Sequence, residues 1–401
     1  MPLRTIPFLA LALGACAAGA TEPGALPAST PLAFVDVQLV TMQSATILPH
    51  QTVLVRDGRI EWLGPLAERT PPPDAVVIAG RGRFLMPALI DMHVHLRSAE
   101  LTTYLDNGIA TVRNMWGFPD VARWAAEIAA GTRVGPTIVS ASQGLDAPPA
   151  QWPLTVLVTQ PEGARAAVQA QQAAGWRWLK VYTRLSAPVF DSILAAARDL
   201  GITPIGHVPL AVDVRSALAA GMHSIEHLTG YDRAVSRSSN AGTWGWIDAD
   251  PARFPALVVA TATAGAWNCP TLAIFSELAR QHNGTERAAV LANRRLFVKQ
   301  LFDAGAPLLL GTDAGIDVVP AGSSIHDELD EMVAAGLTPY QALRTGTAEA
   351  ARFLERQDLG ILATGAEASL LLLEGNPLAA VSNLRHLDGM VLRGAWRPRS
   401  R

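Results

Sequence analysis

The 401-residue sequence has little cysteine, little lysine and no marked excess of either charge. Its two cysteines, Cys16 and Cys269, lie far apart, which excludes a disulfide-stabilised scaffold and a cysteine-rich zinc site. The formal net charge is −3 and no basic run is present, so nucleic-acid binding through a broad basic surface is excluded. Only 2 of the 32 basic residues are lysines, Lys180 and Lys299. Arginine therefore supplies nearly all of the positively charged side chains, so the position of each lysine is considered separately.

The N-terminal residues 1–20 have the pattern of a secretory signal, with an early arginine, an apolar run and then small residues. The sequence Leu-Gly-Ala-Cys ending at Cys16 resembles a bacterial lipobox, which implies cleavage before Cys16 and lipidation of its thiol; the alternative is an ordinary signal peptide with a chance cysteine. Residues 21–30, rich in Ala, Pro, Thr and Ser, are predicted to form a flexible tether. We therefore expect secretion across a bacterial inner membrane and a lipid anchor in the periplasm or cell envelope.

The composition is that of a folded chain, and the length accommodates a large core plus a small second domain. Eight apolar strand patterns, each followed by a helix-like stretch, cover residues 89–96, 109–115, 137–142, 178–183, 204–208, 224–228, 267–273 and 307–312. Eight such pairs predict an α/β fold, a (β/α)8 TIM barrel over residues 86–359. Short β patterns over 31–85 and 360–398 predict a small composite β-sandwich domain built from both chain ends. The long connection 232–253, which contains Trp244 and Trp246, is predicted to be a lid.

Candidate metal ligands stand at the ends of several predicted strands. His93 and His95 are two residues apart on the first strand, so their side chains should point the same way, and imidazole is a common zinc ligand. Four more candidates end the fourth, fifth, sixth and eighth strands: Lys180, His207, His227 and Asp313. Each alone could be structural, as a hydrogen-bonded core histidine or a helix-capping aspartate. Together at one end of a barrel they predict a metal site.

The sequence at this point resembles the amidohydrolase superfamily over almost the whole mature chain. The resemblance rests on Ile90-Asp91-Met92-His93-Val94-His95, the fourth-strand Lys180, the single histidines of strands five and six, and Gly311-Thr312-Asp313. It implies two divalent metal ions, usually zinc. One metal would be held by His93, His95 and Asp313, and the other by His207 and His227. Lys180, carboxylated by carbon dioxide to N6-carboxylysine, would bridge the two, with a hydroxide as the second bridge.

The resemblance further implies hydrolysis of a carbon–nitrogen bond, in which the hydroxide attacks and Asp313 acts as general base and then general acid. The expected substrate is a dipeptide or an N-acyl amino acid. A cyclic amide or imide, as for dihydropyrimidinase or imidazolonepropionase, is the alternative within enzymes. A non-catalytic surface-binding lipoprotein is the alternative from another class. The expected partners are a small-molecule substrate and, through Cys16 alone, a membrane; a homo-oligomer is left open.

Four further residues are candidates for contact with the substrate. Tyr182 lies two residues beyond Lys180 on the same strand face, where its hydroxyl could stabilise an oxyanion as a catalytic residue, or simply pack. Tyr231 and Arg233 follow the sixth strand, and the arginine could clamp a carboxylate. His326 lies beyond Asp313, ahead of an acidic helix, and is a candidate substrate contact or a polar residue at the start of that helix.

Overall fold

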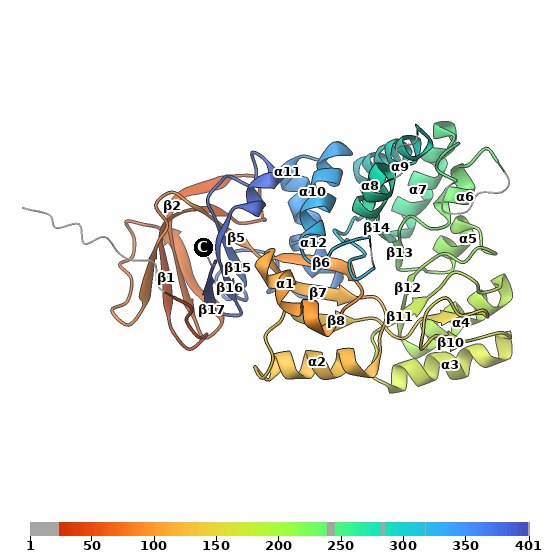
Figure 1. Cartoon of the computed structure of the whole chain (residues 1–401), viewed down its shortest axis with the longest axis horizontal. Helices are drawn as coiled ribbons and strands as arrows, with labels where there is room; N and C mark the ends of the chain where they lie inside the picture. Colours follow the sequence, from red (N-terminus) through yellow and green to blue (C-terminus); the bar gives the residue numbers. More distant parts are fainter. Residues whose placement is uncertain (1–23, 239–244, 282–284, 317, 400–401) are drawn as a thin grey trace, which may run out of the picture.

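The computed structural model describes residues 24–238, 245–281, 285–316 and 318–399. Figure 1 shows a sheet built from both ends of the chain on one side, and parallel strands surrounded by helices on the other. The predicted signal segment and Cys16 lie outside the described residues, so secretion and the lipid anchor stay predictions. None of the helices in the described ranges is long and apolar enough to cross a membrane.

The two chain ends meet in one branched sheet of eight strands, in the order β17-β16-β15-β5-β1-β2-β3, with β4 paired to β1. Its strands are β1 (Leu32–Val40), β2 (Ile47–Arg56), β3 (Arg59–Pro65), β4 (Val76–Ala79), β5 (Phe84–Pro87), β15 (Leu370–Leu373), β16 (Leu387–Leu392) and β17 (Ala395–Pro398). The pairing of β5 with β15 joins the N-terminal strands to the C-terminal ones. The described strands form a single sheet that branches because β1 pairs with three others, and the predicted sandwich packing is not confirmed. Leu26, inside the predicted tether, bridges to Trp396.

The parallel strands lie in two sheets, ordered β6-β7-β8 and β10-β9-β11-β12-β13-β14. They are β6 (Leu89–Val94), β7 (Ile109–Asn114), β8 (Thr137–Ser140), β9 (Leu145–Asp146), β10 (Val156–Leu157), β11 (Trp178–Val181), β12 (Thr203–Gly206), β13 (Ser224–Glu226) and β14 (Trp267–Cys269). Seven of the eight predicted strand segments thus contain a strand. The eighth, 307–312, forms no strand: it makes an isolated bridge from Leu308 to Asn268, and its Leu310 carbonyl accepts from the backbone nitrogen of Met92. A second bridge, Ala141 to Trp178, links the two sheets. The described strands therefore do not form one continuous closed sheet.

The helices follow the strands along the chain. They are α1 (Leu101–Asp106), α2 (Pro119–Ala129), α3 (Pro161–Ala173), α4 (Ala187–Leu200), α5 (Val214–Ala219), α6 (Tyr231–Val235), α7 (Phe254–Ala264), α8 (Leu272–Gln281), α9 (Thr285–Asp303), α10 (Ser324–Ala334), α11 (Pro339–Thr345) and α12 (Ala348–Phe353), with short 3₁₀ turns η1 (Ser98–Glu100), η2 (Pro251–Arg253) and η3 (Val381–Arg385). Proline in the first turn begins several of them, and left-handed Gly201 and Gly265 end α4 and α7. In the predicted lid, Trp246 is fully buried and so anchors the segment, while Trp244 lies outside the described residues.

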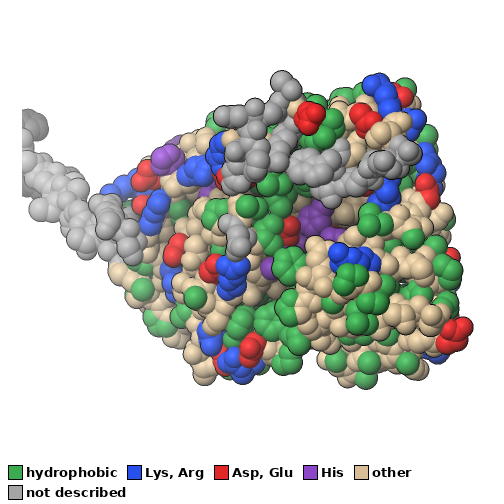
Figure 2. Space-filling model, turned by 45° about the vertical axis from the view of Figure 1, so that its right-hand side comes forward, with side chains coloured by type: hydrophobic (Ala, Val, Ile, Leu, Met, Phe, Trp, Pro, Cys, Tyr) green, Lys and Arg blue, Asp and Glu red, His purple; other side chains and the backbone are tan. Residues whose placement is uncertain are grey.

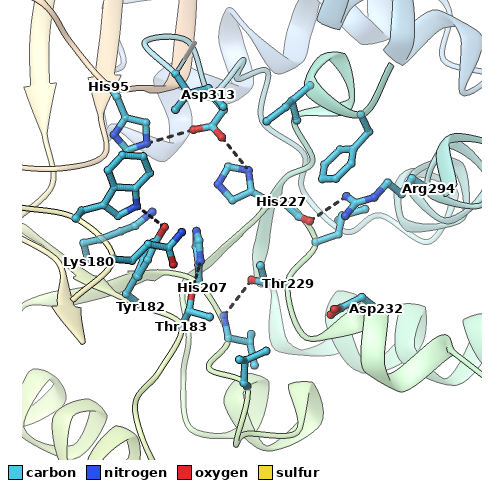
Figure 3. Close-up of a pocket in the computed structure, with 18 of the residues that line it drawn as sticks. His95, Lys180, Tyr182, Thr183, His207, His227, Thr229, Asp232, Arg294 and Asp313 are labelled. Carbon is cyan, nitrogen blue, oxygen red and sulfur yellow. Dashed lines mark hydrogen bonds and ion pairs between the residues drawn. The ribbon is translucent and has the colours of Figure 1, made fainter. Parts of the chain in front are cut away.

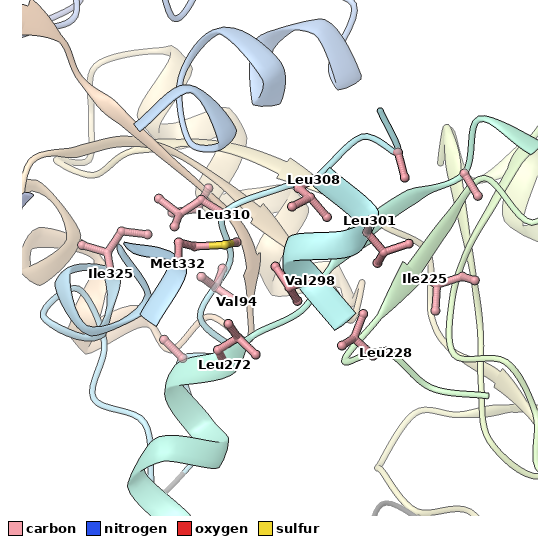
Figure 4. Packing of buried hydrophobic residues seen from close by; sticks show 14 of the residues in the cluster. Val94, Ile225, Leu228, Leu272, Val298, Leu301, Leu308, Leu310, Ile325 and Met332 are labelled. Carbon is pink, nitrogen blue, oxygen red and sulfur yellow. The ribbon is translucent and has the colours of Figure 1, made fainter. Parts of the chain in front are cut away.

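One large apolar core joins the helices to the strands. In Figure 4, Val94 of β6 and Ile225 of β13 belong to the same cluster as Val298 of α9 and Met332 of α10. A second cluster gathers side chains from both parallel sheets, including Met92 of β6 and Trp267 of β14. Strands of the two sheets therefore face a common interior, which brings their carboxyl ends together.

Candidate metal centre

Five of the six predicted ligands line one cavity of about 340 Å³ at the carboxyl ends of the strands (Figure 3): His95, Lys180, His207, His227 and Asp313. The sixth, His93, is buried beside it, with Nε2 3.2 Å from Oδ1 of Asp313. The Nε2 atom of His95 lies at the same distance, 3.2 Å, from the same oxygen. The other carboxylate oxygen of Asp313 is 3.9 Å from Nδ1 of His227. In the space-filling view, histidine surface is visible inside a hollow between apolar side chains (Figure 2).

The close approach of these side chains depends on two glycines. A Cβ at Gly206, where φ is +125°, would lie 2.9 Å from Cδ of Lys180, so this position before His207 leaves room for the lysine chain. A Cβ at Gly311 would lie 2.9 Å from the backbone nitrogen of His93. Glycine therefore lets the segment that carries Asp313 run close against β6.

Three polar atoms at the centre of the cluster are buried without a hydrogen-bond partner among the described residues: Nζ of Lys180, Nε2 of His93 and Oδ1 of Asp313. Each such atom costs about 1–3 kcal/mol unless something else satisfies it. Candidate ligand atoms of His93, His227 and Asp313 all lie within 4.8 Å of one another. Imidazole nitrogens and a carboxylate oxygen are ligands that zinc accepts. The residues present therefore fit a divalent metal ion.

Burial and neighbouring charges set protonation states that suit metal binding. Burial lowers the pKa of His227 to about 3 and that of His207 well below its usual value, so both imidazoles are neutral. Burial alone would raise the pKa of Asp313, but the nearby His227 and His93 outweigh it and hold the pKa well below its usual range. Burial also lowers the pKa of Lys180 to about 8. Neutral histidines and an ionised carboxylate are the forms that bind metals.

One ring nitrogen in each of three histidines already has a hydrogen-bonding partner, which leaves the other nitrogen available for a metal ion. Nδ1 of His207 is hydrogen-bonded to Oγ1 of Thr183 at 2.9 Å, and Nδ1 of His227 to Oγ1 of Thr271 at 2.8 Å. Nδ1 of His93 contacts Oε2 of Glu226 at 2.8 Å. Partners of this kind fix the orientation of histidine ligands.

Glu226 is itself held by a buried arginine. Arg113 of β7 donates from Nη2 to both carboxylate oxygens of Glu226 at 3.0 Å, and both side chains are fully buried. The sequence patterns did not predict this buried ion pair. The available signal was a charged residue inside each of two apolar strands, one of them directly before His227.

Arg113→Met is expected to lower the free energy of unfolding by about 3–5 kcal/mol, because it leaves Glu226 charged and buried without its cationic partner. The measurement is the denaturant unfolding curve. The matched control is Arg165→Met, which removes an exposed arginine paired with Asp199 at 3.0 Å and should cost less than about 1 kcal/mol. Equal losses for the two variants would contradict the buried pair's role.

Two predicted substrate contacts line the cavity. The Tyr182 hydroxyl accepts a hydrogen bond of 2.7 Å from Nε1 of Trp152, and its ring centroid lies 4.2 Å from that of His207. Arg233 also lines the cavity, but Nη2 donates to the backbone carbonyls of Pro209 and Val212 at 2.8 and 2.9 Å.

Contrary to prediction, the structure brings neither Tyr231 nor His326 to the cavity. Tyr231 begins α6 with its side chain turned inward: it is fully buried and its hydroxyl lies 2.8 Å from Oγ1 of Thr261. His326 lies in the first turn of α10, which packs it inside the protein with only 5% of its surface exposed. Both residues lie close in sequence to the site, but their helices turn them into the core.

The structure adds wall residues that the sequence did not suggest. Trp152, from the segment between β9 and β10, stacks on His95 with ring centroids 6.2 Å apart. Arg294 of α9, Asp232 and Phe275 also line the cavity. They belong to helices whose packing, not their sequence, decides which residues face the cavity.

Comparison with known proteins gives the class of the chain. The sequence model of the Amidohydrolase family matches residues 84–396, so the chain belongs to this family, whose members have a TIM-barrel fold and use divalent metals. It is 27% identical to imidazolonepropionase of Anaeromyxobacter dehalogenans, covering 82% of this chain and 85% of that protein. It resembles a solved Bifidobacterium longum structure, provisionally assigned as a prolidase, with a TM-score of 0.76 and 27% identity over 94% of this chain and 97% of that one.

Adenine deaminases are also similar, but over a smaller share of their length. The chain is 26% identical to adenine deaminase 2 of Rhizobium etli, covering 82% of this chain and 52% of that protein. The chain thus spans at most about half the length of the adenine deaminases that it matches.

Proposed function

We propose that the protein is a metal-dependent hydrolase of carbon–nitrogen bonds that cleaves a dipeptide or an N-acyl amino acid. The observation that carries the proposal is the buried cluster of histidines, Lys180 and Asp313 around unsatisfied polar atoms in one cavity. Membership of the Amidohydrolase family and the likeness to a prolidase-assigned protein support it. A cyclic amide is the second candidate, which the similarity to imidazolonepropionase over 82% of the chain favours.

We assign the ligands as follows. His93, His95 and Asp313 would hold one metal ion, and His207 and His227 would hold a second, with zinc as the proposed metal. Bound metals would polarise the scissile carbonyl and lower the pKa of a water molecule.

Lys180 would bridge both metals as a carbamate. Burial, which lowers the pKa of its amine to about 8, favours the neutral form that can attack the carbon of carbon dioxide and then lose a proton. The product is an anionic oxygen ligand, which divalent metals accept.

Two residues of the protein itself would transfer protons or donate hydrogen bonds during the reaction. Asp313, ionised because its pKa is held low, would accept the proton of the attacking water and pass it to the nitrogen of the leaving amine. Burial raises the pKa of Tyr182 to about 12, so its hydroxyl stays protonated. Because the hydroxyl oxygen already accepts from Trp152, its own hydrogen is free to be donated to the oxyanion of the substrate.

The test is metal removal. The purified protein is expected to hold about two divalent ions per chain, to lose more than 90% of its activity on chelation and to regain it with zinc, since two metals act together in such sites. Substrates are N-acyl amino acids, dipeptides and, for the second candidate, cyclic amides. Circular dichroism before and after chelation checks that the fold persists. A protein that holds no metal, or that is fully active without it, would refute the proposal.

A further inference from the structure

The end of the cavity away from Lys180 carries three charged side chains, Arg294, Asp232 and Arg233, in an otherwise largely apolar wall. Figure 3 places Arg294 and Asp232 beyond His227, on the side opposite Lys180 and Tyr182. Two guanidinium groups and one carboxylate leave an excess of one positive charge. This end of the cavity therefore favours an anion.

Arg294 is the least satisfied of these groups. Its side chain is 1% exposed, Nη1 donates to the backbone carbonyl of His227 at 2.9 Å, and Nε has no hydrogen-bond partner among the described residues. Its guanidinium carbon lies 3.4 Å from the ring centroid of Phe275. Burial lowers its pKa to about 9, with Asp232 opposing, so the group is still charged at neutral pH. A buried guanidinium with so few polar contacts is costly, and an anionic ligand would offset that cost.

The neighbouring charges do not satisfy Arg294. One oxygen of Asp232 has no hydrogen-bond partner in the described part of the chain, and the same oxygen lies 3.7 Å from Nη1 of Arg233. Arg233 donates instead to the carbonyls of Pro209 and Val212, which fixes it to the backbone. Arg294 is therefore better placed to bind a ligand than Arg233, the residue that the sequence suggested.

We propose that Arg294 forms a carboxylate-binding subsite that selects substrates with a free carboxylate on the amino acid being released. The inference rests on the proposed function. His227 links the two parts of the site, because its carbonyl accepts from Arg294 while its imidazole faces Asp313. A ligand carboxylate on Arg294 would thus lie in the same cavity as the hydrolytic centre, beside the backbone of one of its proposed metal ligands. Substrates blocked at the carboxyl end are poor substrates.

The experiment compares an N-acyl amino acid with its carboxamide, which has the same shape but no charge. The metal-loaded wild-type protein is expected to prefer the acid by about 100-fold in kcat/KM, the size of a good charge-assisted hydrogen-bonded pair. Arg294→Met is expected to lower kcat/KM for the acid by about 100-fold, mainly through KM, and for the amide by less than about 5-fold. Arg294→Lys keeps the positive charge but loses the paired N–H donors of the guanidinium group, so it should retain only part of the preference for the acid.

The control is Arg295→Met on the same helix, whose side chain pairs with Glu331 at 2.7 Å and does not line the cavity; it keeps the preference for the acid. Equal wild-type kcat/KM values for the acid and the amide would refute the carboxylate subsite but not the proposed hydrolase activity. The subsite is also overturned if Arg233→Met removes the preference and Arg294→Met does not. Calorimetric binding of the acid separates the two proposals: a wild type that hydrolyses none of the N-acyl amino acids, dipeptides and cyclic amides but binds the acid, with Arg294→Met failing to bind it, supports the subsite and refutes the hydrolase.

Discussion

Lys180→Ala is expected to lower kcat/KM by at least about 1,000-fold and to reduce the bound metal below one ion per chain. The residue lies on β11 with only 1% of its surface exposed, and its Nζ has no hydrogen-bond partner in the described ranges. An unmodified ammonium group here would repel two metal ions, whereas a carbamate would bind them. Steady-state kinetics and metal analysis of the purified variant measure the two effects.

The chain supplies its own control, because it has one other lysine. Lys299 lies on α9 and pairs with Asp303 one turn later at 2.6 Å, so Lys299→Ala should change neither metal content nor activity. Lys180→Arg keeps the positive charge, but a guanidinium cannot form the carbamate, and this variant should fail as Lys180→Ala does. Full activity in Lys180→Arg would show that the role of Lys180 is not that of a bridge.

Because lysine is scarce, Lys180 stands out in the sequence. The strand patterns make the residues around it predictable. Apolar runs of four to eight residues identify buried parallel strands, and the ends of such strands meet at one edge. For this reason the strand patterns, taken with the expected barrel, predict that His93, His95, His207 and His227 lie together. Apolar runs do not specify the strand order, and in the structure these residues come from two separate sheets.

The parts that could not be predicted depend on contacts between distant segments. Arg294 reaches the carbonyl of His227 across 67 residues, through the packing of α9, and nothing in the helical sequence marks that face. Tyr231 follows the sixth strand as directly as Arg233 does, yet α6 turns it against Phe297, with ring centroids 4.9 Å apart. The segment 307–312 has the composition of a strand and its backbone is hydrogen-bonded to Asn268 of β14 and Met92 of β6, yet it forms only an isolated bridge.

Backbone strain at the site is also invisible in the sequence. His227, Leu228 and Asp313 have φ of 58°, 53° and 64°, in the left-handed region that costs most residues free energy. Such conformations persist only where the surrounding structure holds them, and two of the three residues, His227 and Asp313, belong to the cluster. This backbone conformation also governs the choice of substitution at Asp313. Asparagine adopts the left-handed region more readily than alanine does, so Asp313→Asn changes the side chain without adding backbone strain.

Asp313→Asn is expected to lower kcat by about 1,000-fold while leaving the fold intact. Asparagine has nearly the same shape and tolerates the φ of 64°, so the change removes the charge and the ability to accept a proton, not the backbone geometry. Loss of an ionised ligand should also weaken metal binding, so the assay is run with saturating zinc to separate the two effects. The measurement is kcat at saturating substrate, with the unfolding midpoint as a check on the fold.

The matched control is Asp36→Asn. Asp36 has φ of 61°, nearly the same backbone conformation as Asp313, but it lies on β1, partly exposed, and contacts His50 at 2.8 Å. The same chemical change at the same backbone angle should leave kcat unaltered, because this carboxylate is outside the cavity. If zinc-saturated Asp313→Asn kept more than about a tenth of the wild-type kcat, Asp313 would not be the proton carrier. The proton would then have to be accepted by another group in the cavity, and one of its histidines would be the next to test.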